Sequence, residues 1–548
     1  AFLGGDKFDD ESCTEISRDV MDKAFEKMLE NSASRDQIGD EEIIYLIDHF
    51  DFEKEGTISV DVFKDAIMEK FTAPKTMSRK TYRPVKPSKN KKAQSIKRLL
   101  AKLCDQVEAH MKKKGKKYSV EKAFQFFDVD GNKYLDASSG PVATNLGHGN
   151  PQVLKAMKEQ SEKVCFASYS VFENEPNKDL AKKLVQLAGP GFDQAFIVSG
   201  GSEAVEAAFK LARQYSLQIG KPEKFKVLSR SASYHGSTMG AFSTSGDPET
   251  HETFGKMAKL MPKVMTPFSY RLPDNYDIDS YARECARNLE ETILNEGPES
   301  ILAFIIETVG GLATGALVAP DHYYEEIRRI CDKYRILLIY DDVMAGAGRT
   351  GTFLSAEHWP QARPDLVVLA KGVSAGYSPL GAVLAPNNLV SEIVKSGGFL
   401  HGHTYVANPL SSAVANAVIS EMIDKDLMKN AIQMGEYLKA ELTKLANKSK
   451  IIGDVRGKGL LLAVELVKHK CSKELLPFEA RAVYRLLEIG IKQGILLYTR
   501  KTAGGAYGEW VMVTPALNIN EIEVDELIDK LSKSITELEV ELQNNDFI

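Results

Sequence analysis

An apolar run that ends in a lysine, Asp365-Leu366-Val367-Val368-Leu369-Ala370-Lys371, is the most informative stretch of this chain. Thirty residues before Lys371, the similar run Ile336-Leu337-Leu338-Ile339-Tyr340 ends in Asp341 and Asp342. Both runs have the length and composition of buried strands. Burial disfavours an ammonium ion and lowers the pKa of a lysine toward that of a neutral, nucleophilic amine. The sequence therefore predicts a reactive amine and a carboxylate at the ends of neighbouring strands.

An amine and a carboxylate in these positions meet the needs of pyridoxal phosphate (PLP). A lysine forms a Schiff base with the aldehyde of this cofactor, and a carboxylate keeps the pyridine nitrogen protonated so that the ring accepts electrons. Lys371 and Asp341 are the candidates for these two roles.

The remaining apolar runs predict the fold class. From about residue 175 onward, helical patterns alternate with short β-rich runs at residues 195–198, 226–229, 301–306 and 381–385. Such runs indicate an α/β fold with a largely parallel sheet covered by helices on both faces. Ligands bind such sheets beyond the carboxyl ends of the strands. The chain after about residue 406, which contains the run 459–465, is long enough for a smaller second α/β domain.

The composition is that of an ordinary soluble protein. The 548 residues, which correspond to roughly three or four typical domains, are 43% hydrophobic and 27% charged, with a net charge of −6. This balance gives no reason to expect a nucleic-acid partner, and no apolar run approaches the roughly 20 residues that span a bilayer. The six cysteines are dispersed without a CxxC motif, so we expect free thiols and no metal site.

The N-terminal part differs from the rest of the chain in charge. Residues 1–71 contain 8 Lys and Arg against 20 Asp and Glu, and residues 72–95 form a basic, proline-bearing linker. The chain starts at Ala1 without an initiator Met. Either a targeting peptide has been removed or the chain was trimmed, and we expect the mitochondrial matrix or the cytoplasm as the compartment.

Within the acidic module, which we expect to be helical, residues 51–62 resemble the calcium-binding loop of an EF-hand. Gly56 occupies loop position six and Ile58 position eight, but Val62 stands where the loop needs a bidentate glutamate. We therefore expect an EF-hand-like module that does not bind calcium tightly and that acts through its surface on a protein partner.

Six segments occur together in the order typical of one enzyme family. They are residues 130–136 with 145–148, 199–204, 233–236, 339–343 with 348–351, 370–372 and 401–405. In these segments the chain resembles the class III PLP-dependent aminotransferases, from about Phe127 to its end. The resemblance implies PLP fold type I, with an N-terminal segment at 96–175, a large domain with a seven-stranded-type sheet at 176–405, and a small domain at 406–548.

The phosphate of the cofactor is expected at Gly201 and Ser202. These residues follow a predicted strand and open a helix that runs from Glu203 to Arg213. Unpaired N–H groups and the positive end of such a helix attract an anion.

The resemblance implies roles for further residues. Tyr234 would stack on the cofactor ring, Val343 would press on its opposite face, and Thr404 would reach the phosphate of a neighbouring subunit in a homodimer. The other candidates are His235 and Glu307 for cofactor binding, and Arg500 and Tyr169 for substrate binding. Two positions depart from the family pattern, because Asp342 replaces a glutamate and Thr308 replaces a proline.

The function that the resemblance implies is transfer of an amino group from an amine or ω-amino acid to an oxo acid such as pyruvate. Donor and acceptor would react in turn, with ping-pong kinetics. Two alternatives stay open at this point. The chain could be a racemase or mutase that uses the same lysine, or a scaffold or regulatory subunit that keeps the enzyme fold.

Overall fold

The computed structural model describes residues 15–17, 57–59, 134–499 and 507–548. The chain divides into two compact units, Ala1–Lys117 and Tyr118–Ile548. In the first unit, β1 (Glu15–Ser17) and β2 (Thr57–Ser59) pair antiparallel, with Ile16 opposite Ile58. The remainder of the predicted acidic module, including both ends of the EF-hand-like loop, and the linker at 72–95 lie outside the described residues.

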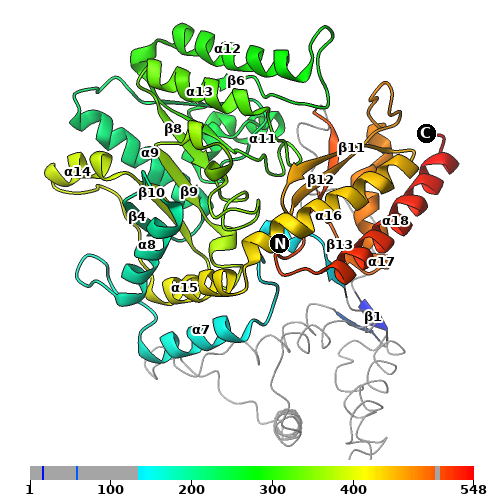
Figure 1. Cartoon of the computed structure of the whole chain (residues 1–548), viewed down its shortest axis with the longest axis horizontal. Coiled ribbons are helices and arrows are strands. Elements are labelled where there is room, and N and C mark those ends of the chain that lie inside the picture. Colours follow the sequence, from blue (N-terminus) through cyan, green and yellow to red (C-terminus); the bar gives the residue numbers. More distant parts are fainter. Residues whose placement is uncertain (1–14, 18–56, 60–133, 500–506) are drawn as a thin grey trace, which may run out of the picture. The chain divides into compact units, whose positions relative to one another are not determined.

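The second unit contains a seven-stranded sheet in the order β4-β10-β9-β8-β7-β5-β6 (Figure 1). The strands are β4 (Gln194–Val198), β5 (Lys226–Arg230), β6 (Lys263–Val264), β7 (Ile301–Ile306), β8 (Leu337–Asp341), β9 (Leu366–Leu369) and β10 (Gly381–Ala385). Only β10 runs antiparallel to its neighbours β4 and β9 in this sheet. The prediction of a mostly parallel sheet is therefore confirmed, and each apolar run that predicted a strand forms one.

Helices cover both faces of this sheet, as the apolar runs predicted. Along β9, Leu366 and Val368 belong to the apolar cluster that includes Ala204 and Ala208 of α9 (Gly201–Gln218). The alternate residues Val367 and Leu369 belong to a different cluster. That second cluster is shared by α8 (Glu175–Ala188), α12 (Ile278–Glu296) and α13 (Asp321–Lys333). Because side chains alternate along a strand, an uninterrupted apolar run is needed to fill both clusters.

Further helices surround this sheet. They are α7 (Pro151–Lys163) and α15 (Pro409–Asp424), which pack together, α14 (Asn387–Lys395), which packs on α9, and the short α6 (Ser139–Val142), α10 (Met239–Thr244) and α11 (Pro248–Phe254).

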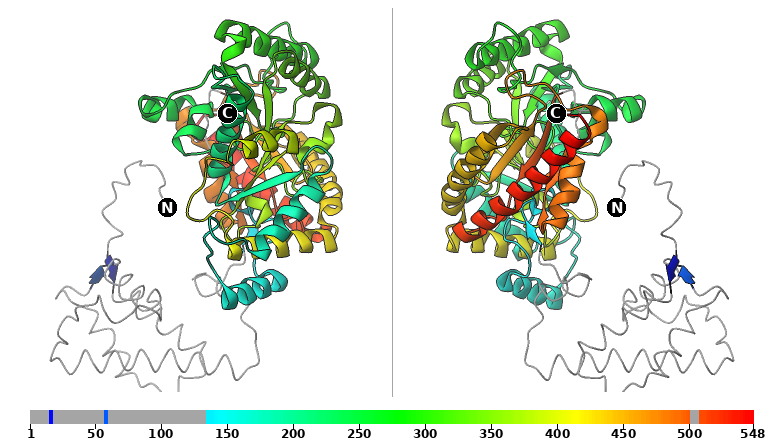
Figure 2. Two further views of the ribbon diagram at one scale, coloured as in Figure 1. Left: turned by 90° about the vertical axis from the view of Figure 1, so that its left-hand side faces the viewer. Right: turned by 90° about the vertical axis from the view of Figure 1, so that its right-hand side faces the viewer.

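A second, smaller sheet is antiparallel and has the order β11-β12-β15-β14. Its strands are β11 (Ile452–Lys458), β12 (Leu461–Leu466), β14 (Tyr498–Thr499) and β15 (Glu509–Val513). The helices beside it are α16 (Leu427–Lys448), α17 (Ala482–Lys492) and α18 (Glu521–Asn544), and α18, in red, runs across this part of the chain in Figure 2. The short strand β13 (Ile495–Leu496) pairs with β3 (Leu135–Asp136).

Arg349 joins the two sheets. Its side chain is fully buried, and its guanidinium donates to the backbone oxygens of Leu460 and Pro515, which flank strands of the small sheet. It also donates to Asn145 Oδ1 at 2.6 Å. Burial lowers the pKa of Arg349 to about 9. A single side chain thus fixes the segment after β8 against the small sheet, and both parts border the cavity described below.

Candidate active site

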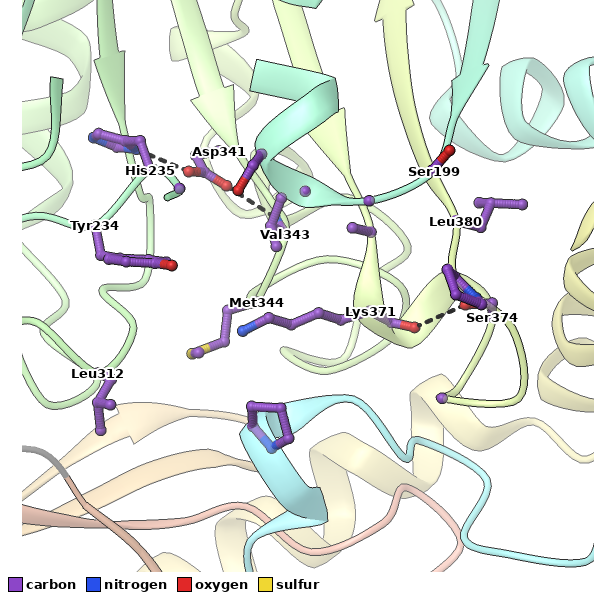
Figure 3. Close-up of a pocket in the computed structure, with 18 of the residues that line it drawn as sticks. Ser199, Tyr234, His235, Leu312, Asp341, Val343, Met344, Lys371, Ser374 and Leu380 are labelled. Atoms are coloured by element: carbon purple, nitrogen blue, oxygen red, sulfur yellow. Dashed lines mark hydrogen bonds and ion pairs between the residues drawn. The ribbon is translucent and has the colours of Figure 1, made fainter. Parts of the chain in front are cut away.

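The carboxyl ends of β4, β8 and β9 and the start of α9 surround a cavity of about 560 Å³ (Figure 3). Eight of the nine predicted cofactor-binding residues line it: Gly201, Ser202, Tyr234, His235, Glu307, Asp341, Val343 and Lys371. The fold brings them together because the register of the sheet places Asp341 opposite Val368, three residues before Lys371. The cavity wall also includes the apolar residues Pro141, Leu312 and Met344 and the aromatic residue Tyr498.

Lys371 follows β9 and begins the short 3-10 helix Lys371–Val373. Its side chain extends into the cavity, toward Tyr234 and Met344 (Figure 3). Burial lowers the pKa of Lys371 to about 8, although the nearby carboxyl groups of Asp341 and Glu307 act in the opposite direction. A large fraction of this amine is therefore neutral near pH 8, and a neutral amine can act as a nucleophile or accept a proton.

Asp341 is the last residue of β8, and its carboxylate is 4% exposed. Its Oδ2 atom lies 2.8 Å from Nδ1 of His235, and its Oδ1 atom accepts a hydrogen bond from the backbone N–H of Val343 at 3.1 Å. His235 is buried as well, and its Nε2 atom has no hydrogen-bond partner among the described residues. These contacts fix an anionic group at the cavity wall, where it can meet a cationic ligand atom.

The two departures from the family pattern lie in contact with each other behind the cavity. Asp342 accepts hydrogen bonds from the backbone N–H of Ser355 at 2.8 Å and from the hydroxyl of Thr308 at 3.4 Å. The Thr308 and Ser355 hydroxyls also contact each other. Burial raises the pKa of Asp342 to about 6. Thr308 provides a hydroxyl that a proline lacks, so the shorter acid at position 342 still has hydrogen-bond donors.

Glu307 connects two walls of the cavity. Its Oε2 atom accepts from the backbone N–H of Tyr234 at 3.2 Å, and its Oε1 atom accepts from that of Gly311 at 2.8 Å. Burial raises the pKa of Glu307, and the neighbouring His235 and Arg230 oppose this shift. The carboxyl group therefore holds the turn that carries Tyr234 against the loop that follows β7.

The N-terminus of α9 forms a third wall. The helix begins at Gly201, and no side chain caps its first N–H groups. Ser202 Oγ accepts from the backbone N–H of Ser237 at 3.0 Å. A Cβ atom on Gly201 would lie 3.0 Å from a methyl group of Val343, and one on Gly236, whose φ is +141°, would lie 2.7 Å from Ser202 Oγ. Glycine is needed at both positions for this close approach, which leaves backbone donors facing the cavity.

Two of the other predicted residues, Thr404 and Tyr169, do not line this cavity. Thr404 is exposed and lies outside the cavity wall, and Tyr169, which is 46% exposed, lies against Gly402. Arg500 lies outside the described residues. Tyr498, two residues earlier, does line the cavity. Tyr498 is not among the residues predicted from the sequence, because nothing in a single sequence distinguishes it from other strand tyrosines.

No helix among the described residues is long and apolar enough to cross a membrane, and no group of three or more His, Cys, Asp or Glu side chains among them is placed to hold a metal ion. The four described cysteines, Cys165, Cys285, Cys331 and Cys471, are free.

Comparison with known proteins identifies the family. The profile of the class-III aminotransferases matches residues 111–535. The uncharacterized aminotransferase YodT of Bacillus subtilis is 36% identical over 429 residues, which are 78% of this chain and 96% of YodT. The taurine–pyruvate aminotransferase of Bilophila wadsworthia is 34% identical over 77% of this chain and 92% of its own length.

A solved structure agrees with this result. It is that of an amine transaminase from an uncultivated Pseudomonas species in its PLP-bound form, which is 32% identical and superimposes with a TM-score of 0.71. The match covers 75% of this chain and 92% of the other. The chain thus belongs to the class-III aminotransferases, a PLP-dependent family, and it is a transaminase with the α/β fold of PLP fold type I.

Proposed function

We propose that the cavity is the active site of this transaminase and that Lys371 is its catalytic residue. The observation that carries the proposal is the position of the Lys371 amine, whose pKa is lowered to about 8, in one cavity with the buried Asp341 and the uncapped start of α9. PLP, when bound, supplies an aldehyde that holds an amine covalently and a ring that accepts electrons from a substrate carbon.

The chemistry of the cavity wall fits this cofactor. The N–H groups at Gly201 and Ser202 would hold the phosphate, since they belong to an uncapped helix N-terminus. Asp341 would pair with the protonated ring nitrogen, because among the described residues its only ion-pair partner is a histidine. Tyr234 and Val343 would contact the two faces of the ring, while His235 and Glu307 hold Asp341 and Tyr234 in place.

Lys371 would have two roles in the first half of the reaction. It first holds the cofactor covalently, and the donor amine then displaces it. The freed amine stays in the cavity and, because its pKa lies near 8, it can take a proton from the substrate carbon and return it to the cofactor. Since the donor leaves as an oxo product before the oxo acid binds, we expect ping-pong kinetics.

The donors we propose are amines and ω-amino acids, with pyruvate as an acceptor. Two observations support them. The relatives include a taurine–pyruvate aminotransferase, and the described part of the cavity wall contains the apolar side chains of Leu312 and Met344 together with the aromatic residue Tyr498. Arg500 stays a candidate for binding a carboxylate through two charge-assisted hydrogen bonds, and Tyr169 stays a candidate for substrate contact.

We also propose a homodimer in which Thr404 reaches the partner's cofactor phosphate. Exposed apolar side chains gather on two segments that lie side by side, 164–174 and 399–408. They include Val171, Phe172, Leu400 and Tyr405, which are 60–85% exposed, and the rings of Phe166 and Tyr405 are in edge contact at 6.1 Å. A contiguous apolar patch of this kind marks a protein interface.

The predictions for the N-terminal part stay predictions. They are that the acidic module does not bind calcium tightly, that it binds a protein partner, and that the protein acts in the mitochondrial matrix or the cytoplasm.

Replacing Lys371 tests the catalytic assignment. Lys371→Ala should lower transamination at least about a thousandfold, since it removes both the covalent attachment and the proton carrier. Borohydride reduction of the PLP-loaded wild type, followed by peptide mapping, should place the pyridoxyl group on Lys371. Lys395→Ala, which changes an exposed lysine of α14, is the matched control and should keep full activity. A pyridoxyl group on another lysine would refute the assignment.

The lowered pKa of Lys371 predicts how cofactor capture depends on pH. Burial disfavours the ammonium form, so the fraction of neutral amine should rise about tenfold between pH 7 and pH 9 and then level off. The rate at which the cofactor-free protein captures PLP should follow this curve, whereas the rate for Nα-acetyl-lysine, measured separately in the same buffers, should keep rising up to about pH 10. A capture rate that keeps rising several-fold between pH 9 and pH 10 would contradict the lowered pKa.

The association state tests the proposed dimer. Sedimentation velocity at micromolar concentration should show a dimer, and Leu400→Asp should weaken it because the leucine is 85% exposed within the apolar patch. Ile522→Asp, at an 80% exposed position on α18, is the control and should leave the dimer intact. A monomeric wild type with full activity would exclude shared sites.

A further inference from the structure

The loop at residues 310–317, which we call the wall loop, follows β7 and contributes Leu312 to the cavity. The backbone N–H of Gly310 donates to the oxygen of Leu317 at 2.8 Å, which closes the loop. Every residue of the wall loop is buried, and Thr314 and Ala316 have no exposed surface. The position of Leu312 is therefore determined by the groups that pack behind the wall loop.

Trp510, in β15 of the small sheet, is one of these groups. It is fully buried, and its indole Nε1–H donates to the backbone oxygen of Leu312 at 2.8 Å. Its ring lies against Gly315, where the φ angle is +59° and a Cβ atom would lie 2.5 Å from the indole. The indole therefore holds Leu312 through a hydrogen bond and fills the space that the glycine leaves.

Arg456, in β11, binds the next part of the wall loop. Its Nε donates to the oxygen of Gly315 at 2.6 Å, and its Nη2 donates to that of Thr314 at 3.2 Å. The guanidinium carbon also lies 5.3 Å from the centre of the Trp510 ring. Three carbonyl groups of the wall loop thus accept hydrogen bonds from two side chains of the small sheet.

Two carboxylates, the buried Glu465 and the partly exposed Asp454, fix Arg456 on the side away from the wall loop. Its Nη1 donates to Glu465 of β12 at 2.5 Å and to Asp454 of β11 at 2.9 Å. The other oxygen of Glu465 accepts from Nε of Arg271 at 2.8 Å. Charge-assisted hydrogen bonds of this kind are short and directional, so the guanidinium has little freedom to move away from the wall loop.

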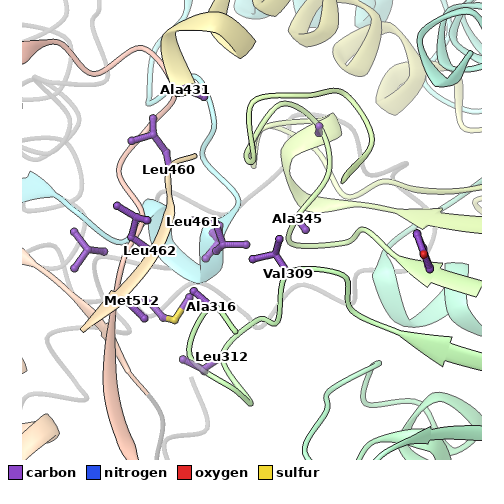
Figure 4. Close-up of a cluster of buried hydrophobic side chains, with 14 of the residues drawn as sticks. Val309, Leu312, Ala316, Ala345, Ala431, Leu460, Leu461, Leu462 and Met512 are labelled. Atoms are coloured by element: carbon purple, nitrogen blue, oxygen red, sulfur yellow. The ribbon is translucent and has the colours of Figure 1, made fainter. Parts of the chain in front are cut away.

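Apolar side chains also join the small sheet to the wall loop. Figure 4 shows Leu461 and Met512 of the small sheet beside Ala316 and Val309, which belong to or adjoin the wall loop. A shift of the small sheet would therefore carry the wall loop with it. In Figure 3 the amine of Lys371 points to the side of the cavity where Leu312 stands.

We propose that Trp510 and Arg456 are positioning residues that determine donor selectivity, because they fix the wall loop and with it the Leu312 side of the cavity. They touch neither Lys371 nor Asp341 and do not line the cavity. The inference rests on the proposed function in one respect, namely that the donor lies between Lys371 and Leu312. A substitution that removes the hydrogen bonds of either side chain to the wall loop should let the cavity accept bulkier apolar amines. It should leave the cofactor contacts unchanged.

The chain offers a matched pair of variants for the test, since it has only two tryptophans. Trp510→Phe keeps an aromatic ring but removes the N–H that binds Leu312. Trp359→Phe removes the N–H that donates to Asp321 at 2.9 Å in the large domain, and Trp359 does not line the cavity. Arg456→Lys is a second test variant, because a lysine can keep the ion pair with Glu465 but cannot also bind both carbonyls.

Hydrogen exchange measured by mass spectrometry on the full chain gives a readout that does not depend on activity. Peptides that cover residues 310–318 should exchange at least about fivefold faster in Trp510→Phe and Arg456→Lys, the scale of one lost hydrogen bond. The same peptides should be unchanged in Trp359→Phe. Equal exchange in all four proteins would overturn the proposal.

Steady-state kinetics give the second readout. The ratio of kcat/KM for 1-phenylethylamine to kcat/KM for β-alanine should rise at least about fivefold in Trp510→Phe and Arg456→Lys. The dissociation constant for PLP should stay within about twofold, and Trp359→Phe should match the wild type. A ratio that does not move while PLP still binds overturns this inference alone. Failure of the wild type to bind PLP would instead refute the proposed function.

Discussion

The burial of an amine and a carboxylate at the ends of two adjacent parallel strands is the constraint on which the rest of the structure depends. Asp341 ends β8 and Lys371 follows β9, and the register of these strands brings both to one edge of the sheet. Neither group would stay buried in its charged form without a partner. The sheet therefore needs an apolar interior to lower the pKa of the amine, and polar neighbours to keep the carboxylate in place.

Those polar neighbours form a connected set around the cavity. His235 contacts Asp341, Glu307 holds the turn before His235, and Arg230 donates to the backbone oxygen of Glu307 at 2.5 Å. The small sheet adds a second set through Trp510 and Arg456, which bind the opposite wall. The cavity wall at Asp341 and Glu307 is thus fixed within the large sheet, while the wall at Leu312 depends on contacts between the two sheets.

The groups around Asp341 can be predicted from the sequence far better than the contacts of Trp510 and Arg456 with the wall loop. A short continuous apolar run rich in β-branched residues favours a strand buried on both faces, so β8, β9 and the residues that end them could be located without a structure. The contact between Trp510 and Leu312 joins positions 198 residues apart, and no local pattern marks either residue. The same holds for Thr308, Ser355 and Asp342, since the two family departures were visible in the sequence but their contact was not. Arg500 and most of the acidic module lie outside the described residues.

The central claim is that Lys371 attaches the cofactor and moves the proton, whereas Asp341 stabilises the protonated ring. Single-turnover kinetics of Asp341→Asn test this claim most directly. PLP should still be trapped on Lys371 after borohydride reduction, because the lysine is unchanged. Reaction of the loaded variant with a donor amine should be slower by roughly a hundredfold or more, since the ring would lose the anion that stabilises its protonated form. A first half-reaction within about threefold of the wild-type rate would contradict the account.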